Sequence, residues 1–153
     1  MLDIRSARIG DLAGILELYR ELRPADPPLS PSLAQQRLCE LIENPQTHVI
    51  VVGDGAHLVG SCMLGLIPTL TNGARPFGMI EHVITANTVR GQGIGKQMLR
   101  FVIDLAWQEN CYKVMLLSGI QRVEAHRFYE NLGFRGDVEK GYVLKPDWDI
   151  QPS

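Results

Sequence analysis

The stretch IEHVITANTVRGQGIGKQML, residues 80–99, decides the fold of this chain. It begins as an apolar strand, passes through a short loop and reaches three alternating glycines, Gly91, Gly93 and Gly95, ahead of a segment with helical apolar spacing. Small residues let the backbone approach a ligand, and the free amides of a first helical turn attract negative charge. The stretch therefore predicts an anion site that fits a pyrophosphate.

Two common phosphate-binding patterns do not fit this loop. The Walker loop needs glycine where Arg90 stands and Ser or Thr where Gln97 stands. The dinucleotide fingerprint needs a third glycine three residues after Gly93, where the chain has Lys96. Neither a P-loop nucleotide site nor a dinucleotide site is expected.

The elements expected around this loop alternate between strands and helices. Apolar patterning predicts strands at 2–8, 48–52, 57–66, 79–85 and 113–117, and a weak last strand at 141–144. Helices are expected after an N-cap at Asp11, after Ser30 or Ser32, and over 93–109 and 123–131. Asp54-Gly55 is a hairpin signal between the second and third strands. This order predicts a mixed sheet with helices on its faces.

Composition limits the class of protein. The 153 residues suit one domain, 1–153, and the net charge of -2 lacks the basic excess of a nucleic-acid-binding protein. The three cysteines are far apart, which disfavours a disulfide framework and favours a reducing, cytoplasmic compartment. No run reaches the ~18 apolar residues of a membrane span, and no set of side chains has metal-ligand spacing. We therefore expect no membrane, nucleic-acid or metal partner.

Three segments resemble the GNAT superfamily of N-acetyltransferases. Arg90-x-x-Gly93-x-Gly95 is similar to its coenzyme A loop, AHRFYENLGF (125–134) to its second motif, and IRSARIGDLAGILELY (4–19) to its first strand and helix. The resemblance implies an α/β (α+β) GNAT fold with a central, mixed, mostly antiparallel twisted sheet of six to seven strands and about four helices.

The resemblance also implies a site for acetyl-coenzyme A. Val83 and Ile84 would offer backbone groups to the pantetheine arm. The pyrophosphate would be held by the backbone amides of Arg90, Gly91, Gln92, Gly93, Ile94, Gly95 and Lys96. One departure is Arg122, which stands where the family often has Asn, so a side-chain contact to the cofactor differs here.

Acetyl transfer to an amine requires a base that removes a proton and an acid that protonates the leaving thiolate. By resemblance Tyr129 lies beside the thioester sulfur and is the candidate acid; a core aromatic is the alternative. Glu81 interrupts an apolar central strand, where an ionisable side chain is costly, and is the candidate base; a solvated strand residue is the alternative. His82 and His126 are weaker candidates. Strand alternation predicts that Glu81 shares a face with Val83 and Thr85, opposite Ile80, His82 and Ile84.

The expected acceptor is a primary amine of a small molecule. IEHV and CYKVMLL (111–117) resemble glucosamine-6-phosphate N-acetyltransferases, whereas SGIQRVEAHRFYENLGF (118–134) resembles bacterial small-amine acetyltransferases. Loops 23–32 and 68–76 and the C-terminal strand are expected to form the acceptor pocket. A coenzyme A-binding regulatory protein without turnover and a protein N-terminal acetyltransferase subunit are the rival hypotheses.

The assembly state is left open by the sequence. The apolar residues Tyr142, Val143, Leu144 and Trp148 would either pack against a second copy, giving a homodimer, or close the core.

Overall fold

The computed structural model describes residues 1–148. Its contacts divide the chain into two compact units, residues 1–116 and a second unit that begins at Leu117. The expectation that 1–153 form one domain stays a prediction, and its last five residues lie outside the described part.

The first unit contains the whole sheet and three of the α-helices. Its elements in order are β1 (Asp3–Ser6), α1 (Leu12–Leu22), α2 (Pro31–Glu43), β2 (Thr47–Gly53), β3 (Leu58–Ile67), β4 (Phe77–Thr85), α3 (Ile94–Gln108) and β5 (Val114–Met115). Three short 3-10 helices lie at η1 (Ile9–Asp11), η2 (Asn72–Ala74) and η3 (Asn87–Val89). The second unit contains α4 (Val123–Asn131).

The five strands form one sheet in the order β1-β2-β3-β4-β5. The first three pairings are antiparallel, and β4 pairs with β5 in parallel. The expected α/β class, the mixed and mostly antiparallel sheet and the four helices are thus confirmed.

The strand count is lower than the expected six to seven, at five within residues 1–148. The strand expected at 113–117 is reduced to β5, and 141–144 forms no strand. A strand needs a neighbouring backbone to pair with, and the described part of the second unit contains no other strand. Tyr142 and Leu144 are accordingly 84% and 74% exposed. Their expected packing against a second copy stays a prediction.

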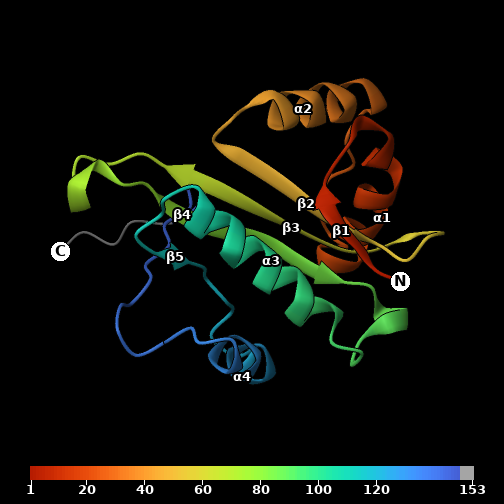
Figure 1. The fold of residues 1–153 in the computed structure, drawn as a ribbon. Helices are drawn as coiled ribbons and strands as arrows, with labels where there is room; N and C mark the ends of the chain where they lie inside the picture. Colours follow the sequence, from red (N-terminus) through yellow and green to blue (C-terminus); the bar gives the residue numbers. More distant parts are fainter. Residues whose placement is uncertain (149–153) are drawn as a thin grey trace. The chain divides into compact units, whose positions relative to one another are not determined.

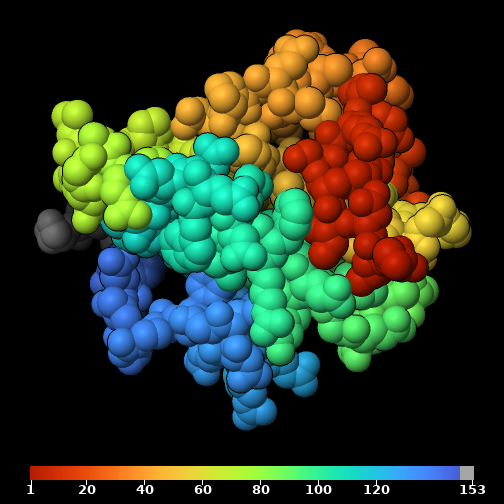
Figure 2. Space-filling view, in the orientation of Figure 1, coloured from red at the N-terminus to blue at the C-terminus, as the bar shows by residue number. Residues whose placement is uncertain are grey.

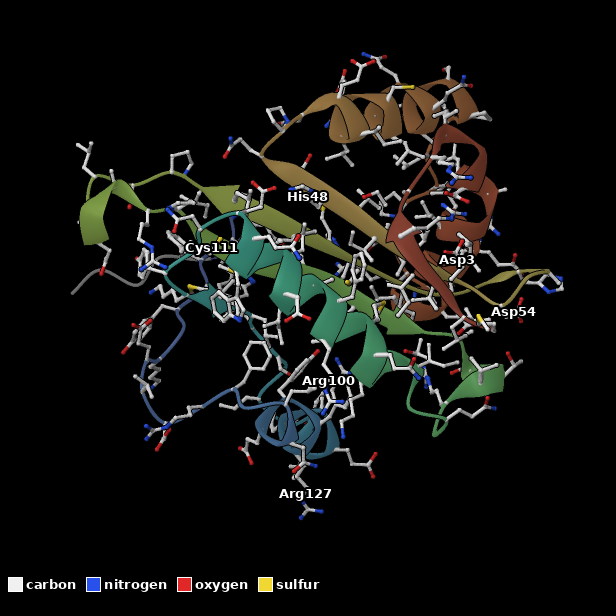
Figure 3. The ribbon with its side chains drawn as sticks, viewed as in Figure 1. Asp3, His48, Asp54, Arg100, Cys111 and Arg127 are labelled. Atoms are coloured by element: carbon white, nitrogen blue, oxygen red, sulfur yellow. The ribbon has the colours of Figure 1, made fainter. Side chains whose placement is uncertain are left out.

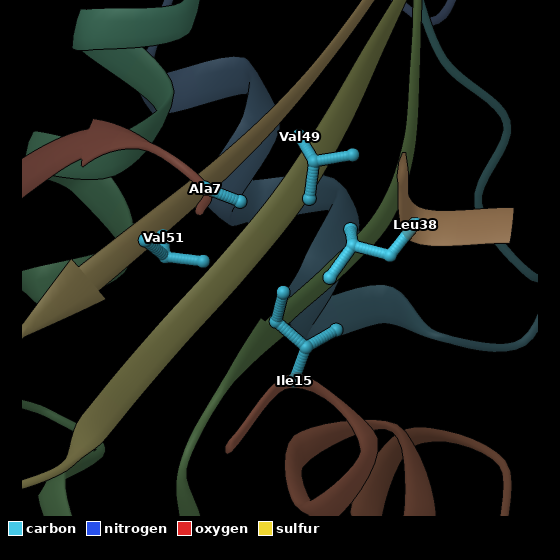
Figure 4. Packing of buried hydrophobic residues seen from close by; sticks show 5 residues of the cluster. All are labelled: Ala7, Ile15, Leu38, Val49 and Val51. Carbon is cyan, nitrogen blue, oxygen red and sulfur yellow. The ribbon is translucent and has the colours of Figure 1, made fainter. Parts of the chain in front are cut away.

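Helices cover both faces of the sheet, with α1 and α2 on one face and α3 on the other (Figure 1). On the α1/α2 face, Ile15 of α1 and Leu38 of α2 pack with three residues of the sheet layer, Ala7, Val49 and Val51 (Figure 4). Burial of each large apolar side chain in this layer stabilises the fold by about 1.5–3 kcal/mol.

On the other face, α3 packs directly on the sheet. A Cβ placed on Gly60 of β3 would lie 3.4 Å from both Met98 Sδ of α3 and Val52 of β2, so glycine permits the helix to approach the sheet. The completely buried residues of this layer include Ile50, Cys62, Leu64, Met98, Leu99 and Val102. The α3 helix is therefore fixed firmly on the sheet, and so is its first turn.

The starts of α1 and α2 differ in whether the expected N-cap residue caps its helix. Ser30 caps α2 as expected, since its Oγ accepts the amide of Leu33 at 3.3 Å. Asp11 precedes α1 as expected but its carboxylate does not cap that helix. It accepts two hydrogen bonds from Arg5 at 2.7 and 3.0 Å and one from the Arg8 amide at 2.7 Å. Asp11 therefore ties β1 to the turn before α1.

Asp11→Asn is expected to lower the free energy of unfolding at pH 7 by about 1–3 kcal/mol, because a charge-assisted pair is lost. The Arg5 guanidinium lowers the pKa of the Asp11 carboxyl below its ordinary value, so this stabilisation is present above that value and is lost as the pH falls. Urea unfolding should therefore show a difference from wild type that shrinks from about pH 5 towards pH 2. Asp3→Asn, at a 68% exposed partner of Arg5, is the control and should change little. A pH-independent difference for Asp11→Asn would contradict this account.

The hairpin between β2 and β3 forms where Asp54-Gly55 predicted it (Figure 3). Asp54 Oδ1 accepts the amides of Ala56 and His57 at 3.0 and 2.8 Å, and Gly55 has φ 100°.

In the second unit, α4 covers the expected 123–131, and the chain turns at Gly133 with φ 101°.

Candidate functional site

A β-bulge interrupts the pairing of β4 with β3. Ser61 of β3 pairs with Ile84 and Met63 pairs with Glu81, so two residues, His82 and Val83, lie opposite Cys62 alone. His82 adopts φ 53°, a left-handed conformation that is uncommon for a residue other than glycine. Bulges bend a strand and redirect its side chains, and they occur often beside active sites.

The bulge makes the expected alternation along β4 wrong. Directly opposed residues of neighbouring strands point to the same face, so Glu81 shares a face with Met63 and Val49, and Ile84 shares it with Ser61. Because the bulge inserts one extra residue, Glu81 and Ile84 lie on the same face, and Ile80 lies on the α3 face. Glu81 is exposed on the face that α1 and α2 cover.

Sequence reasoning missed a polar group beside the bulge on α1. Tyr19 lies next to Ser61, whose Oγ donates to the carbonyl of Ile50 at 3.0 Å. Burial raises the pKa of the Tyr19 phenol, and the neighbouring Ser61 hydroxyl opposes that rise. The Tyr19 ring lies 5.7 Å from the His82 ring, centroid to centroid. A tyrosine in the apolar stripe of α1 and a serine in an apolar strand were the available signals.

One edge of β4 is unpaired next to the bulge. The pairing of β4 with β5 stops at Gly78 and Met79, and from Ile80 to Thr85 this edge has no strand partner within residues 1–148. Val83 and Ile84 lie in this stretch. Free backbone groups on a strand edge can hydrogen-bond an extended ligand as a further strand would.

The glycine loop follows β4 after the short helix η3. Gly91 and Gly93 have φ 80° and 79°, and Gly93 is the N-cap residue of α3. A Cβ on either glycine would meet nothing within 4 Å, so the loop needs glycine for its backbone conformation and has open space beside it. No side chain caps α3 and no acidic residue stands in its first turn. The first-turn amides of this 15-residue helix and the neighbouring cations Arg90 and Lys96 therefore suit a pyrophosphate.

Gly93→Ala is expected to raise the Kd for coenzyme A about tenfold, because a left-handed alanine costs about 1–2 kcal/mol and the loop relieves that strain by turning its amides away. Titration calorimetry measures the change. Gly10→Ala is the matched control, since Gly10 has no positive φ and open space around it. Equal affinity of Gly93→Ala and wild type would contradict a role for these amides.

The loops expected to line the acceptor pocket both belong to the first unit. The loop between α1 and α2 connects the two helices on the face of Glu81. The loop after β3 is held by Arg75, which donates to the carbonyls of Asn110 at 3.2 Å and Cys111 at 3.0 Å. Figure 2 shows this yellow-green loop beside the teal end of α3, and its Leu70 is 98% exposed. Their expected role stays a prediction.

The second unit carries the candidate acid. Tyr129 of α4 forms edge-to-face contacts with Phe128 and Phe134, with ring centroids 5.3 and 5.9 Å away. His126 Nε2 lies 2.8 Å from the carbonyl oxygen of Gly119, which is the bond of a structural histidine. Ser118 Oγ is buried without a hydrogen-bond partner in the described part of the chain.

Within 1–148 no group of three His, Cys, Asp or Glu side chains is arranged to hold a metal ion. None of the helices in this range has both the length and the apolar character needed to cross a membrane.

Comparison with known proteins identifies acetyltransferases as the proteins that this chain resembles. Residues 15–134 match the model of the Acetyltransferase (GNAT) family. A glucosamine 6-phosphate N-acetyltransferase of Trypanosoma brucei brucei is 33% identical over 134 residues, which is 88% of this chain and 89% of that protein. A solved structure from Agrobacterium tumefaciens str. C58 is 37% identical with a TM-score of 0.88, covering 94% of this chain and 99% of the other. An acetyltransferase of Trypanosoma brucei superposes with a TM-score of 0.82 at 31% identity, covering 95% and 99%.

Proposed function

Because this chain belongs to the GNAT acetyltransferase family, we propose that it transfers the acetyl group of acetyl-coenzyme A to a primary amine of a small molecule. The chain is an N-acetyltransferase by family, and the family uses acetyl-coenzyme A. The acceptor class and the residue roles are the proposal. The single observation that carries it is the exposed Glu81 beside a bulge in β4, the strand that precedes the glycine loop and the N-terminus of α3, which no side chain caps.

The donor side is built from β4 and the loop after it. The amides of residues 90–96 and the charges of Arg90 and Lys96 hold the pyrophosphate. The unpaired edge of β4 at Val83 and Ile84 offers backbone groups to the amides of the pantetheine arm. This arrangement orients the thioester along β4 towards the bulge.

Glu81 and Tyr129 divide the proton transfers between them. An alkylammonium has a pKa near ~10 and is almost wholly protonated at neutral pH, so Glu81 removes a proton, directly or through water, before the nitrogen attacks the thioester carbon. As the carbon–sulfur bond breaks, Tyr129 donates its phenolic proton to the departing thiolate. The nitrogen of the tetrahedral intermediate loses its second proton, which returns through solvent to the Tyr129 phenolate, and Glu81 releases its proton to solvent. The amide product and free coenzyme A result.

Glucosamine 6-phosphate is the first acceptor to test. The 33% identical trypanosomal relative carries that name, and its match extends over most of both chains. An amino sugar phosphate would present its amine to the α1/α2 face, where Glu81, His82 and Tyr19 lie together. A cytoplasmic location and a homodimer stay predictions from the sequence.

The test is thiol release from acetyl-coenzyme A across amino sugars, amino sugar phosphates, amino acids, polyamines, aminoglycosides and peptides. Thiol release should be fast with at least one small primary amine and slow without an amine. Coenzyme A binding without release by any acceptor would favour a regulatory protein. Release with peptides alone would favour protein N-terminal acetylation.

A further inference from the structure

A carboxylate on α1 reaches the segment that leads into the glycine loop of residues 90–96, which is called the cradle below. Glu21 Oε2 accepts the backbone amide of Asn87 at 2.9 Å, across 66 residues of sequence. Asn87 is the first residue of η3, and the residue before it, Ala86, has no side chain able to cap that turn. Glu21 therefore caps η3 from a distant element.

The segment that Glu21 caps is a closed arch between β4 and the glycines. The Ala86 amide donates to the carbonyl of Val59 at 2.9 Å, and the Val89 amide donates back to Ala86 at 3.1 Å. Arg90 Nε donates to the carbonyl of Thr85 at 3.1 Å, closing the arch at its base. Among these hydrogen-bonded groups, the Asn87 amide is the one bonded to α1, through Glu21. A displacement of the arch moves Arg90, the first residue of the cradle.

The end of α1 is packed against the same segment. Leu18 of α1 is buried with Ile84 and Ala86, and Leu22 and Val89 pack on that cluster. Glu21 lies in the last turn of α1, where the helix dipole disfavours an acidic side chain. Its hydrogen bond to Asn87 therefore serves the arch and not the helix that carries it.

We infer that Glu21 is a positioning residue of the donor site, which holds the Asn87–Arg90 arch so that the cradle amides face the pyrophosphate. The inference rests on the proposed function, because it assigns Glu21 to the coenzyme A loop. Two effects of the carboxylate oppose each other. Its hydrogen bond orders the arch, whereas its charge repels an anionic ligand. Replacement variants separate the two effects.

The experiment titrates coenzyme A into wild type, Glu21→Ala, Glu21→Gln and Glu17→Gln by calorimetry. Glutamine keeps an acceptor oxygen without the charge, so Glu21→Gln should bind as tightly as wild type or more tightly. Glu21→Ala should bind about threefold to tenfold more weakly, because the arch loses a charge-assisted bond on an exposed side chain. Glu17→Gln removes the same charge one turn earlier on α1 and should match wild type. Steady-state kinetics should show the loss for Glu21→Ala in KM for acetyl-coenzyme A, with kcat little changed.

The outcomes separate this inference from the proposed function. If wild type does not bind coenzyme A, the proposed function fails. If wild type binds it and Glu21→Ala binds equally or more tightly, the positioning role is wrong and charge repulsion is the main effect. A lowered kcat with unchanged KM would also overturn the inference. Tm values of the four proteins show whether a loss of folding accounts for any change.

Discussion

Glu81→Gln is expected to lower kcat about 10²- to 10⁴-fold, because the amide cannot accept the proton that the attacking ammonium must lose. The Kd for acetyl-coenzyme A should stay within about twofold of the wild-type value. Glu81 lies on the α1/α2 face, whereas the groups proposed to bind the donor are backbone amides of residues 90–96 and the edge of β4. The side chain is exposed and glutamine has nearly the same shape, so folding should be little affected. Rapid-quench single turnovers with a saturating amine would measure the loss at the chemical step.

The pH dependence distinguishes a base from a substrate contact. The neutral fraction of the amine rises about tenfold per pH unit below its pKa, so the deficit of Glu81→Gln should shrink as the pH rises towards that pKa. Glu43→Gln, at an exposed carboxylate of α2, is the control and should leave the profile unchanged. A deficit that is constant with pH, or a variant as active as wild type, would show that Glu81 is not the base.

Tyr129→Phe is expected to lower kcat on the order of 10²-fold and leave the Kd for coenzyme A within about twofold, because only the phenolic proton donor is lost. Phenylalanine keeps the ring that packs between Phe128 and Phe134, so the aromatic contacts of α4 persist. Stopped-flow detection of the released thiol measures the rate. An acetyl-donor thioester with a better leaving thiol should restore much of the lost rate, because its thiolate needs less protonation.

Tyr142→Phe is the matched control, since Tyr142 is an 84% exposed tyrosine of the same unit. If Tyr129 has only a packing role, Tyr129→Phe and Tyr142→Phe should both behave as wild type. Such a result would remove Tyr129 from the mechanism.

The parts of the fold predicted correctly depend on local sequence. Ser30 and Pro31 define the start of α2, and Asp54-Gly55 defines a hairpin. Gly93 defines the start of α3 through its left-handed backbone conformation. The donor site stays a prediction, and the sequence alone can propose it because its groups are consecutive amides of one loop.

The parts that could not be predicted depend on partners distant in sequence. The bulge at His82 is defined by the register against β3, and alternation within β4 alone gave the wrong face for Glu81 relative to Ile84. The Asp11 carboxylate accepts hydrogen bonds from Arg5 of β1 and does not cap α1. The Tyr19–Ser61 pair joins α1 to β3, and Glu21 joins α1 to the loop after β4. No pattern within one segment contains that information.

Acetyl transfer to nitrogen is tested most directly by mass spectrometry of the product. The protein is incubated with acetyl-coenzyme A carrying an isotopically labelled acetyl group and with the amine that gives the fastest thiol release, beginning with glucosamine 6-phosphate. The account predicts one labelled acetyl group on the amine nitrogen for each thiol released. Labelled free acetate in place of labelled amide, or no labelled amine from any acceptor while coenzyme A binds, would contradict it.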